Sequence, residues 1–141
     1  MEQALIEMYK FSPEQHELIA ITERMLEAIH TGDTATYGGL CDAGLTCYED
    51  VCPHRIDGVD FHLALVQQMA QRPEMRPTRC DMLEPGVQIY GTSAIVTYTR
   101  LMTYADTGPP RWATSSETRV FSSLSGSWKM VHFHRTTLCL P

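Results

Sequence analysis

The feature that most constrains the fold of this chain is a change in its hydrophobic periodicity at Thr78. Before Thr78, apolar side chains recur every three or four positions, which is the spacing of amphipathic helices. After it, apolar and polar residues alternate with a period of two, as in strands that bury one face. Helices followed by a run of strands predict an α+β domain, with the helices packed on a strongly curved antiparallel sheet.

The first and longest helix is expected to begin at Pro13 and to end at Gly32. Pro13 suits the first helical position, Ser12 can serve as the N-cap, and Gln15 completes a capping box. Glycine commonly closes a helix, as Gly32 would here. The predicted buried stripe of this helix consists of Leu18, Ile21, Met25, Leu26 and Ile29.

Two shorter helices are predicted before the long strands begin. One extends from Asp33, as its N-cap, to Cys41. The other takes Asp60 as its N-cap and stops before Pro73. The apolar stripe of this last helix is Phe61, Leu65 and Met69.

A short strand is expected at residues 44–49, and the stretch VCPHRIDG at 51–58 is predicted to be a loop. The longer strands are predicted at 78–84, 87–91, 93–104, 112–122 and 127–136. Turn-forming residues separate them in the sequences EPG, GTS, TGPP and SGS. Long strands bent around a helix form a cone with a pocket. This order of elements resembles the nuclear-transport-factor-2-like (NTF2-like) fold.

Length and composition limit the classes of protein to which the chain can belong. Its 141 residues suffice for one domain, and 43% hydrophobic with 20% charged residues is typical of a globular protein. A net charge of −6 argues against nucleic acid or an anionic membrane as the main partner. No apolar run approaches the roughly 18 residues of a spanning helix, and residues 1–11 lack the basic region of a signal peptide. We therefore expect a cytoplasmic protein.

The five cysteines are expected to be reduced. They are odd in number, follow no zinc-finger spacing and accompany no secretory signal. Disulfide bonds are the alternative. We interpret these side chains as mostly small buried hydrophobic groups, namely Cys41, Cys47, Cys52, Cys80 and Cys139.

Three neighbouring strands each place one arginine, Arg100, Arg119 or Arg135, among large apolar side chains. The residues that share these faces by strand alternation are Val96, Tyr98, Met102 and Tyr104 for the first, Glu117 and Phe121 for the second, and Val131 and Phe133 for the third. In the last strand, the opposite face would carry Trp128, Met130, His132 and His134.

Taken singly, each arginine can be explained as a strand-end side chain whose stem is packed and whose head is in water. Three guanidinium groups converging in one cleft would repel one another, and an unpaired buried charge costs several kcal/mol. Glu117 and Glu49 are the partners that the sequence offers, too few for three positive charges. We therefore expect an arginine pocket that receives an anion, above all a carboxylate from a small molecule or from another chain.

The histidines allow more than one interpretation. His132 and His134 form an H-x-H pair, a spacing found in zinc sites, and Cys139 and His62 are available as further ligands. The alternative location of the pair is the outer sheet face or a subunit contact, and we predict no metal. His62, just after a helix start, either hangs over the pocket mouth as a titratable donor or is solvated.

Residues 17–136 contain a long series of short motifs that occur together in one known family. They are Thr22-Glu23, Glu27-Ala28-Ile29, Gly32-Asp33, Cys41-Asp42, Gly44-Leu45-Thr46, Gly58, Asp60-Phe61-His62, Tyr98, Arg100-Leu101, Glu117-Thr118-Arg119-Val120, Gly126, Trp128 and Val131-His132-Phe133-His134-Arg135. In their order and spacing, the chain resembles the association (hub) domain at the C-terminus of calcium/calmodulin-dependent protein kinase II.

The resemblance implies a cone-shaped domain that pairs and then closes into two-tiered rings. It also implies a pocket whose arginines correspond to Arg100, Arg119 and Arg135 and whose histidine corresponds to His62. Such a pocket is expected to take carboxylate-bearing ligands or linker segments, without a cofactor.

Tyr48 and Glu117 complete the set of residues that we expect to bind the ligand. The hub-like domain is expected to span residues 13–137, between an N-terminal extension at 1–12 and a C-terminal tail at 138–141. The chain departs from the family in the loop EDVCPHRID and in the ending TTLCLP. It also has no Gly-rich phosphate loop, H-R-D or D-F-G motif of a kinase, and no basic calmodulin target. We expect either a free-standing hub or an excised one.

Three functions follow from these observations. The preferred one is a self-assembling scaffold without catalytic residues. The second is a small enzyme, because the same fold hosts isomerases, cyclases and dehydratases. Tyr48, Asp60 or His62 would then act as the base, and Arg100 would stabilise an enolate-like charge. The third is a partner module that joins the hub rings of a related kinase.

Overall fold

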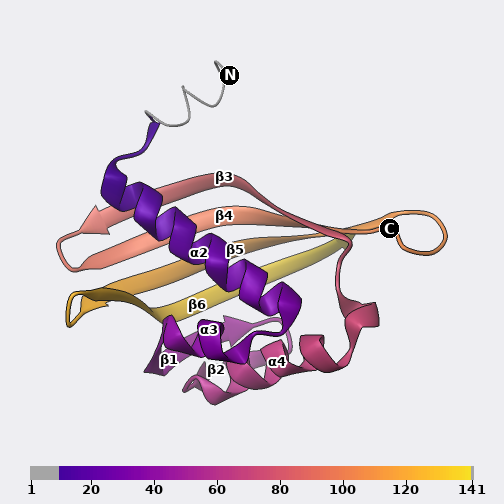
Figure 1. Cartoon of the computed structure of the whole chain (residues 1–141), viewed down its shortest axis with the longest axis horizontal. Helices are drawn as coiled ribbons and strands as arrows, with labels where there is room; N and C mark the ends of the chain where they lie inside the picture. Colours follow the sequence, from indigo (N-terminus) through magenta and orange to yellow (C-terminus); the bar gives the residue numbers. More distant parts are fainter. Residues whose placement is uncertain (1–9, 141) are drawn as a thin grey trace.

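The computed structural model describes residues 10–140, with side chains up to residue 138. Within this range, the helices pack on one face of a curved six-stranded sheet (Figure 1). The helical elements are α2 (Pro13–Thr31), α3 (Thr34–Gly39), α4 (Asp60–Gln71) and the 3-10 turn η1 (Pro73–Met75). The strands are β1 (Cys41–Glu49), β2 (Cys52–Asp57), β3 (Arg79–Tyr90), β4 (Ser93–Tyr104), β5 (Arg111–Leu124) and β6 (Ser127–Leu140). The predicted α+β class is confirmed.

Helix α2 is built as its sequence predicts. The Ser12 side chain accepts a hydrogen bond from the Gln15 amide, and the Gln15 side chain accepts one from the Ser12 amide, so the capping box is complete. At the other end Gly32 adopts φ 76°, a left-handed conformation that glycine reaches without a Cβ penalty. A Cβ at Gly32 would also lie 2.3 Å from the Cβ of Ala70 in α4. This glycine therefore allows α2 and α4 to approach each other closely.

Helix α4 differs from the prediction in its cap and in its buried face. Val59 occupies the N-cap position without a side-chain hydrogen bond, and Asp60 lies in the first turn instead of capping the helix. The buried side chains are His62 and Val66. The side chains of the predicted stripe are only partly buried: Phe61, Leu65 and Met69. Helix α4 contacts α2 and α3, and its buried face is the one that carries His62 and Val66.

The strand order of the sheet is β2-β1-β6-β5-β4-β3, so β6 lies between β1 and β5. It pairs antiparallel with β5 but parallel with β1, where Cys47 is opposite Phe133. The described sheet is therefore mixed, with one parallel pairing among antiparallel ones. The prediction of a loop at 51–58 is wrong, because Cys52–Asp57 form the edge strand β2. An edge strand tolerates Pro53, since one of its sides needs no hydrogen-bond donors.

The sequence predicts two strands in the region that β3 occupies as one. The EPG sequence forms a bulge between Leu83 and Gly86 instead of a turn, with Glu84 at φ 51°. Pairing with β4 continues on both sides of this bulge. The extra residues bend the strand without ending it.

A second bulge lies in β6, near its middle. Phe121 of β5 is opposite Met130, and the preceding Val120 is opposite His132. Val131 is thus an extra residue that has no partner of its own in β5. Strand alternation in β6 therefore shifts by one position at Val131.

This shift decides which side chains of β6 face the helices. Trp128 and Met130 are buried, as are Phe133 and, in part, Arg135, so all four belong to the inner face. The prediction that Trp128 and Met130 share a face with the H-x-H pair is wrong, because alternation was counted through the bulge. The inward direction of Arg135 and Phe133 is as predicted.

The apolar core lies between α2 and the part of the sheet nearest the turns at 91–92 and 125–126. Its members include Leu18, Met25, Leu26, Leu45, Val87, Ala94, Val96, Phe121, Trp128 and Met130. Further along the same strands, buried polar residues replace the apolar ones: Tyr98, Arg100, Ser115, Glu117 and Arg119. The inner face of the sheet thus changes from apolar to charged along its length.

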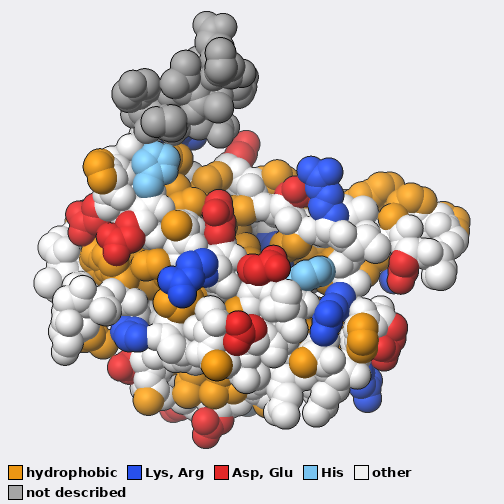
Figure 2. Space-filling view, viewed as in Figure 1, with side chains coloured by type: hydrophobic (Ala, Val, Ile, Leu, Met, Phe, Trp, Pro, Cys, Tyr) orange, Lys and Arg blue, Asp and Glu red, His pale blue; other side chains and the backbone are white. Residues whose placement is uncertain are grey.

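Other whole-chain expectations can be compared with the described residues. Cys41, Cys47, Cys52 and Cys80 are all free, as predicted, and the side chain of Cys139 lies outside the described set. Within residues 10–140 the helices are all too short or too polar to cross a membrane. Acidic and basic side chains are scattered over the helix-covered face instead of forming one basic patch (Figure 2). Residues 1–9, most of the predicted N-terminal extension, also lie outside the described residues.

Candidate functional site: an arginine-lined cavity

A cavity of about 250 Å³ lies between α4 and the charged end of the inner sheet face. Arg100 from β4, Arg119 from β5 and Arg135 from β6 line it, together with His62 from α4 and Glu49 from β1. The three arginines thus converge on one cavity, as predicted. The strand-end alternative fails for Arg100 and Arg119, whose exposed fractions are 4% and 0%. Only Arg135 keeps a partly exposed side chain, at 24%.

Arg119 is the most deeply buried of the three arginines and is held by tyrosines. Its Nε donates a hydrogen bond of 2.9 Å to the Tyr98 hydroxyl, and its Nη1 donates one of 3.3 Å to the Tyr37 hydroxyl. The guanidinium also lies over the ring of Phe133, 4.4 Å from its centroid, in a cation–π contact. These contacts fix the guanidinium plane at the inner end of the cavity.

Glu117 is a buried neighbour of the cavity, not part of its lining. Its two carboxylate oxygens accept hydrogen bonds from Tyr98 at 2.6 Å and from Ser115 at 2.5 Å. The nearest arginine nitrogens lie at 3.6 Å in Arg119 and 3.9 Å in Arg100, beyond hydrogen-bond distance. One carboxylate is therefore shared loosely between two guanidinium groups.

Arg135 has two acidic partners of its own. Its Nη2 lies 2.8 Å from Glu49 Oε2, and its Nε lies 3.3 Å from Asp50 Oδ2. Asp50 also accepts a hydrogen bond from the Thr137 amide. Burial raises the pKa of Glu49, and the charge of Arg135 opposes that increase. Because both acids serve the outermost arginine, the excess of positive charge lies at the inner end, where Arg100 and Arg119 share only Glu117.

His62 is buried in the cavity wall, with 4% of its surface exposed. Its Nδ1 lies 3.0 Å from the Tyr37 hydroxyl, its ring stacks on that of Tyr37, and Phe133 contacts it edge-on. Burial, and then the charges of Arg119 and Arg135, lower the pKa of His62 to about 4. The ring is therefore neutral at pH 7. The predicted solvated position is wrong, since His62 is a buried side chain of α4, whereas the predicted place in the pocket is where His62 lies.

The hydrogen bonds of Tyr37 assign the His62 tautomer. The Tyr37 hydroxyl accepts a hydrogen bond from Arg119, which is always a donor, and therefore donates its own hydrogen bond to His62 Nδ1. The imidazole proton then resides on Nε2, which lies 3.9 Å from Glu49 Oε1. Among the described residues, neither His62 Nε2 nor Arg119 Nη2 has a hydrogen-bond partner, although both atoms are buried. The inner end of the cavity therefore presents two unsatisfied donors.

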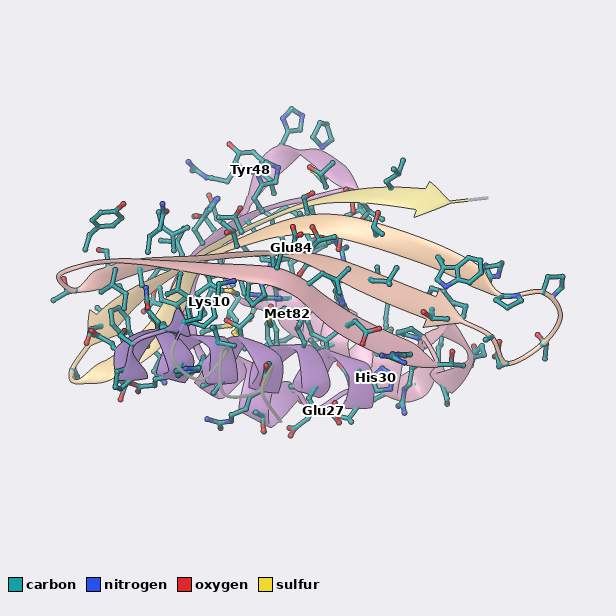
Figure 3. All side chains as sticks on the ribbon, turned by 90° about the horizontal axis from the view of Figure 1, so that it is seen from above. Lys10, Glu27, His30, Tyr48, Met82 and Glu84 are labelled. Atoms are coloured by element: carbon teal, nitrogen blue, oxygen red, sulfur yellow. The ribbon has the colours of Figure 1, made fainter. Side chains whose placement is uncertain are left out.

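Tyr48 is absent from the cavity, contrary to the prediction. It lies on the outer sheet face, 40% exposed, on the opposite side of the sheet from the helices (Figure 3). The reason is strand alternation, because its neighbours Cys47 and Glu49 both point inward. The ring of Tyr48 instead contacts His132 and His134, whose outer-face location is the alternative that the sequence allowed. In the described part of the chain, no group of three or more possible ligands is placed to hold a metal ion.

Three site residues were missed by sequence reasoning: Tyr37, Tyr98 and Asp50. Tyr37 and Tyr98 look like apolar core residues in the sequence, and only their hydroxyl contacts show their polar role. Asp50 directly follows Glu49, which is a signal that could have been used. The apolar part of the cavity wall is formed by Leu65, Val66, Met69, Met102 and Phe133. Met102 and Phe133 share the arginine faces as predicted, whereas the three α4 residues were not predicted to line the cavity.

Known proteins with this sequence pattern share its fold. A family model described as the calcium/calmodulin dependent protein kinase II (CaMKII) association domain matches residues 14–139. The chain belongs to this family. It is 36% identical over 125 residues to the delta subunit of rabbit CaMKII, covering 86% of this chain and 23% of that protein. The chain thus spans about a quarter of the length of that curated relative.

Solved structures agree with this membership. The association domain of C. elegans CaMKII superposes with a TM-score of 0.77 and 31% identity, covering 87% of this chain and 95% of that one. An NTF2-like protein from Cytophaga hutchinsonii superposes with a TM-score of 0.71 and 13% identity, covering 90% of this chain and all of the other. The second likeness shows the NTF2-like fold alone.

Proposed function

We propose that this chain is a self-assembling hub that forms closed, two-tiered rings and binds a carboxylate in its arginine-lined cavity. The match to the association-domain family over residues 14–139 carries the first part of the proposal. The outer sheet face supports it, because the described helices leave that face open (Figure 3). Exposed apolar side chains on the strands, Tyr48, Trp112 and Leu138 among them, are available for contact with other copies.

The assembly is tested by measuring the solution mass by light scattering behind a sizing column. The monomer mass is 15.9 kDa. A closed ring predicts one species of roughly a dozen subunits, unchanged on dilution over the micromolar range, because every interface in a ring is satisfied. A monomer or a simple dimer would overturn the ring.

The carboxylate proposal depends on the two unsatisfied donors at the inner end of the cavity. A carboxylate placed there would accept hydrogen bonds from Arg119 Nη2 and His62 Nε2 and would balance the excess positive charge of Arg100 and Arg119. The apolar wall, including Val66 and Met69, would cover a short hydrocarbon chain. A small molecule or the side chain of a linker segment would both satisfy this chemistry.

The cavity is tested by thermal-shift and calorimetric titration with butyrate, using butyramide as an uncharged analogue of the same shape. Butyrate is expected to raise the melting temperature, and butyramide is expected to have no effect. An Arg135→Ala variant should lose most of the shift, because Glu49 would then face the ligand in the cavity without its cation. Arg55→Ala, which removes an exposed arginine on β2, should keep the shift. No shift in the unaltered protein, or an equal shift with Arg135→Ala, would overturn the proposal.

A small enzyme is the alternative, and one observation favours it. Glu49 is a buried carboxylate in the cavity with a raised pKa, close to the neutral His62. Its ion pair with Arg135 commits it to a structural partner and makes it a poor general base. The other candidate bases, Tyr48 and Asp60, do not line the cavity. Isomerase or dehydratase turnover that is lost with His62→Ala would establish the enzyme.

Mixed assembly with the hub of a related kinase is the third proposal, and it follows from family membership. Co-expression of a tagged kinase hub with this chain, followed by capture through the tag and mass measurement, tests it. Rings that contain both chains would support the proposal, and rings of a single type only would overturn it.

A further inference from the structure

A second cavity of about 400 Å³ lies between α2 and the beginning of β3. Figure 3 shows Glu27 and His30 on α2 and Met82 on β3 beside it. Cys80 lines this groove and is partly exposed there. The groove and the arginine-lined cavity have no lining residue in common.

Arg100 connects the two spaces. Its guanidinium lines the arginine-lined cavity, and its Nε donates a hydrogen bond of 3.1 Å to the Cys80 sulfur in the groove. Its Nη1 is 3.9 Å from Glu117 Oε2, too far for a hydrogen bond. Among the hydrogen bonds of the described residues, that to Cys80 is thus the one that sets the position of this buried guanidinium.

We propose that Cys80 positions Arg100 for ligand binding, so that changing the thiol from the groove changes carboxylate affinity in the other cavity. This inference rests on the proposed carboxylate site. Without an acceptor, the buried Nε–H would be left unsatisfied, which is costly. Arg100 would then move toward Glu117, the nearest carboxylate, and away from the ligand. Cys80 acts through Arg100 and does not touch the ligand itself.

The thiol is open to chemical modification from the groove. Iodoacetamide would form a bond from its CH₂ carbon to the Cys80 sulfur, iodide would leave with the electrons of the carbon–iodine bond, and the thiol proton would go to solvent. The added group would displace the Arg100 guanidinium. Cys41 and Cys47 are poor competitors, because burial raises their pKa values to about 12 and about 11.

Calorimetric titration with butyrate separates hydrogen bonding from packing. Cys80→Ala removes the acceptor and should weaken butyrate binding roughly fivefold, the effect of one ordinary hydrogen bond. Cys80→Ser, whose hydroxyl accepts from Nε, should bind within about twofold of the unaltered protein. Cys52→Ala, on the opposite edge of the sheet, is the matched control and should have no effect.

Alkylation and a double-mutant cycle complete the test. Iodoacetamide should weaken butyrate binding by the unaltered protein, and it should not weaken binding by the Cys80→Ala variant any further. In an Arg100→Met background, Cys80→Ala should have no additional effect on butyrate affinity. If the unaltered protein binds butyrate and Cys80→Ala binds it equally well, the role of Cys80 is overturned and the carboxylate site stands. The role is also overturned if Cys80→Ser is as weak as Cys80→Ala. If the unaltered protein does not bind butyrate, both proposals fall.

Discussion

The inner face of the sheet has two halves that are built from the same strands and differ in what covers them. In the apolar half, β4, β5 and β6 supply Val96, Phe121 and Met130, and α2 packs directly on β3 and β4. In the charged half, the same three strands supply the three arginines, and α4 faces them across the cavity. Strand alternation continues through both halves, interrupted only by local bulges. It therefore determines which side chains point inward, and the covering helix determines whether they meet packed atoms or open space.

The largest loss of stability is expected from Arg119→Met, in the charged half of the sheet. This change should lower the free energy of unfolding by about 3 to 5 kcal/mol, because the buried charge of Glu117 would have only the more distant Arg100 as a cationic partner. A volume-conserving change in the apolar half, Leu18→Met, should cost less than about 1.5 kcal/mol. Urea unfolding at pH 7 measures both.

The electrostatic origin of that effect can be tested separately. Adding Glu117→Gln to Arg119→Met removes the buried carboxylate that has lost its closer cation and should recover part of the loss, although Arg100 then has no acidic partner. If the double variant is no more stable than Arg119→Met, then lost packing and not charge explains the result.

The next largest effect is expected from Gly32→Ala, which acts on the covering helix. Alanine would be strained at φ 76° and its Cβ would meet Ala70 at 2.3 Å, so α4 must shift. We expect a loss of about 2 to 4 kcal/mol together with weaker butyrate binding. Gly91→Ala, at φ 61° with open space around it, carries only the backbone strain of about 1 kcal/mol and should leave butyrate affinity unchanged. Equal losses in the two variants would show that the close contact with α4 is unimportant.

Acidification should weaken the charged half through His62. Its pKa is about 4 in the folded protein against 6.5 in the unfolded chain, so the unfolded state takes up the proton first as the pH falls. This contribution is lost between about pH 6.5 and 4 and amounts to about 2 kcal/mol between pH 7 and 5. The contribution of Glu49 to stability has the opposite sign, because its pKa is raised in the folded protein and the folded state is stabilised when this carboxylate becomes protonated. The His62→Gln variant tests the contribution of the histidine. Between pH 7 and 5 its unfolding free energy should fall by about 2 kcal/mol less than that of the unaltered protein. An unchanged pH dependence would contradict the assignment.

The smallest effect is expected from Tyr48→Ala on the outer face. The side chain is exposed and its ring contacts are with His132 and His134, so the stability of the isolated fold should change by no more than about 0.5 kcal/mol. Butyrate affinity should be the same as in the unaltered protein. A lower affinity, measured by calorimetry, would mean that a change at Tyr48 alters the cavity on the inner face of the sheet.

Much of the site could be predicted because three strands placed Arg100, Arg119 and Arg135 at inward positions. That reasoning needs only alternation and the adjacency of consecutive strands. The reasoning failed where a bulge shifted the alternation of side chains by one residue, as at Val131. The sequence has no Gly or Pro there to indicate the bulge. The inward prediction for Arg135 succeeded because it was counted from Phe133, on the same side of the bulge.

Other features depend on tertiary contacts that periodicity does not contain. The cap of α4 and the orientation of His62 follow from how α4 packs against α2 and α3. The hydroxyl groups of Tyr37 and Tyr98 became part of the site only once Arg119 was placed between them. Tyr48 could have been excluded from the sequence, because Glu49 was already assigned inward and adjacent strand residues face opposite sides.

The central position of β6 has a consequence for how the polypeptide reaches its native state. Its parallel partner β1 is separated from it by more than eighty residues, as in the pairing of Cys47 with Phe133. Until residues 127–140 have been synthesised, the hairpin β1–β2 and the meander β3–β5 have no strand to join them. Sequence-distant pairing of this kind slows folding, and during translation β5 and β1 would each present an unpaired edge. The nascent chain is therefore expected to be open to edge-to-edge association during the interval before β6 becomes available.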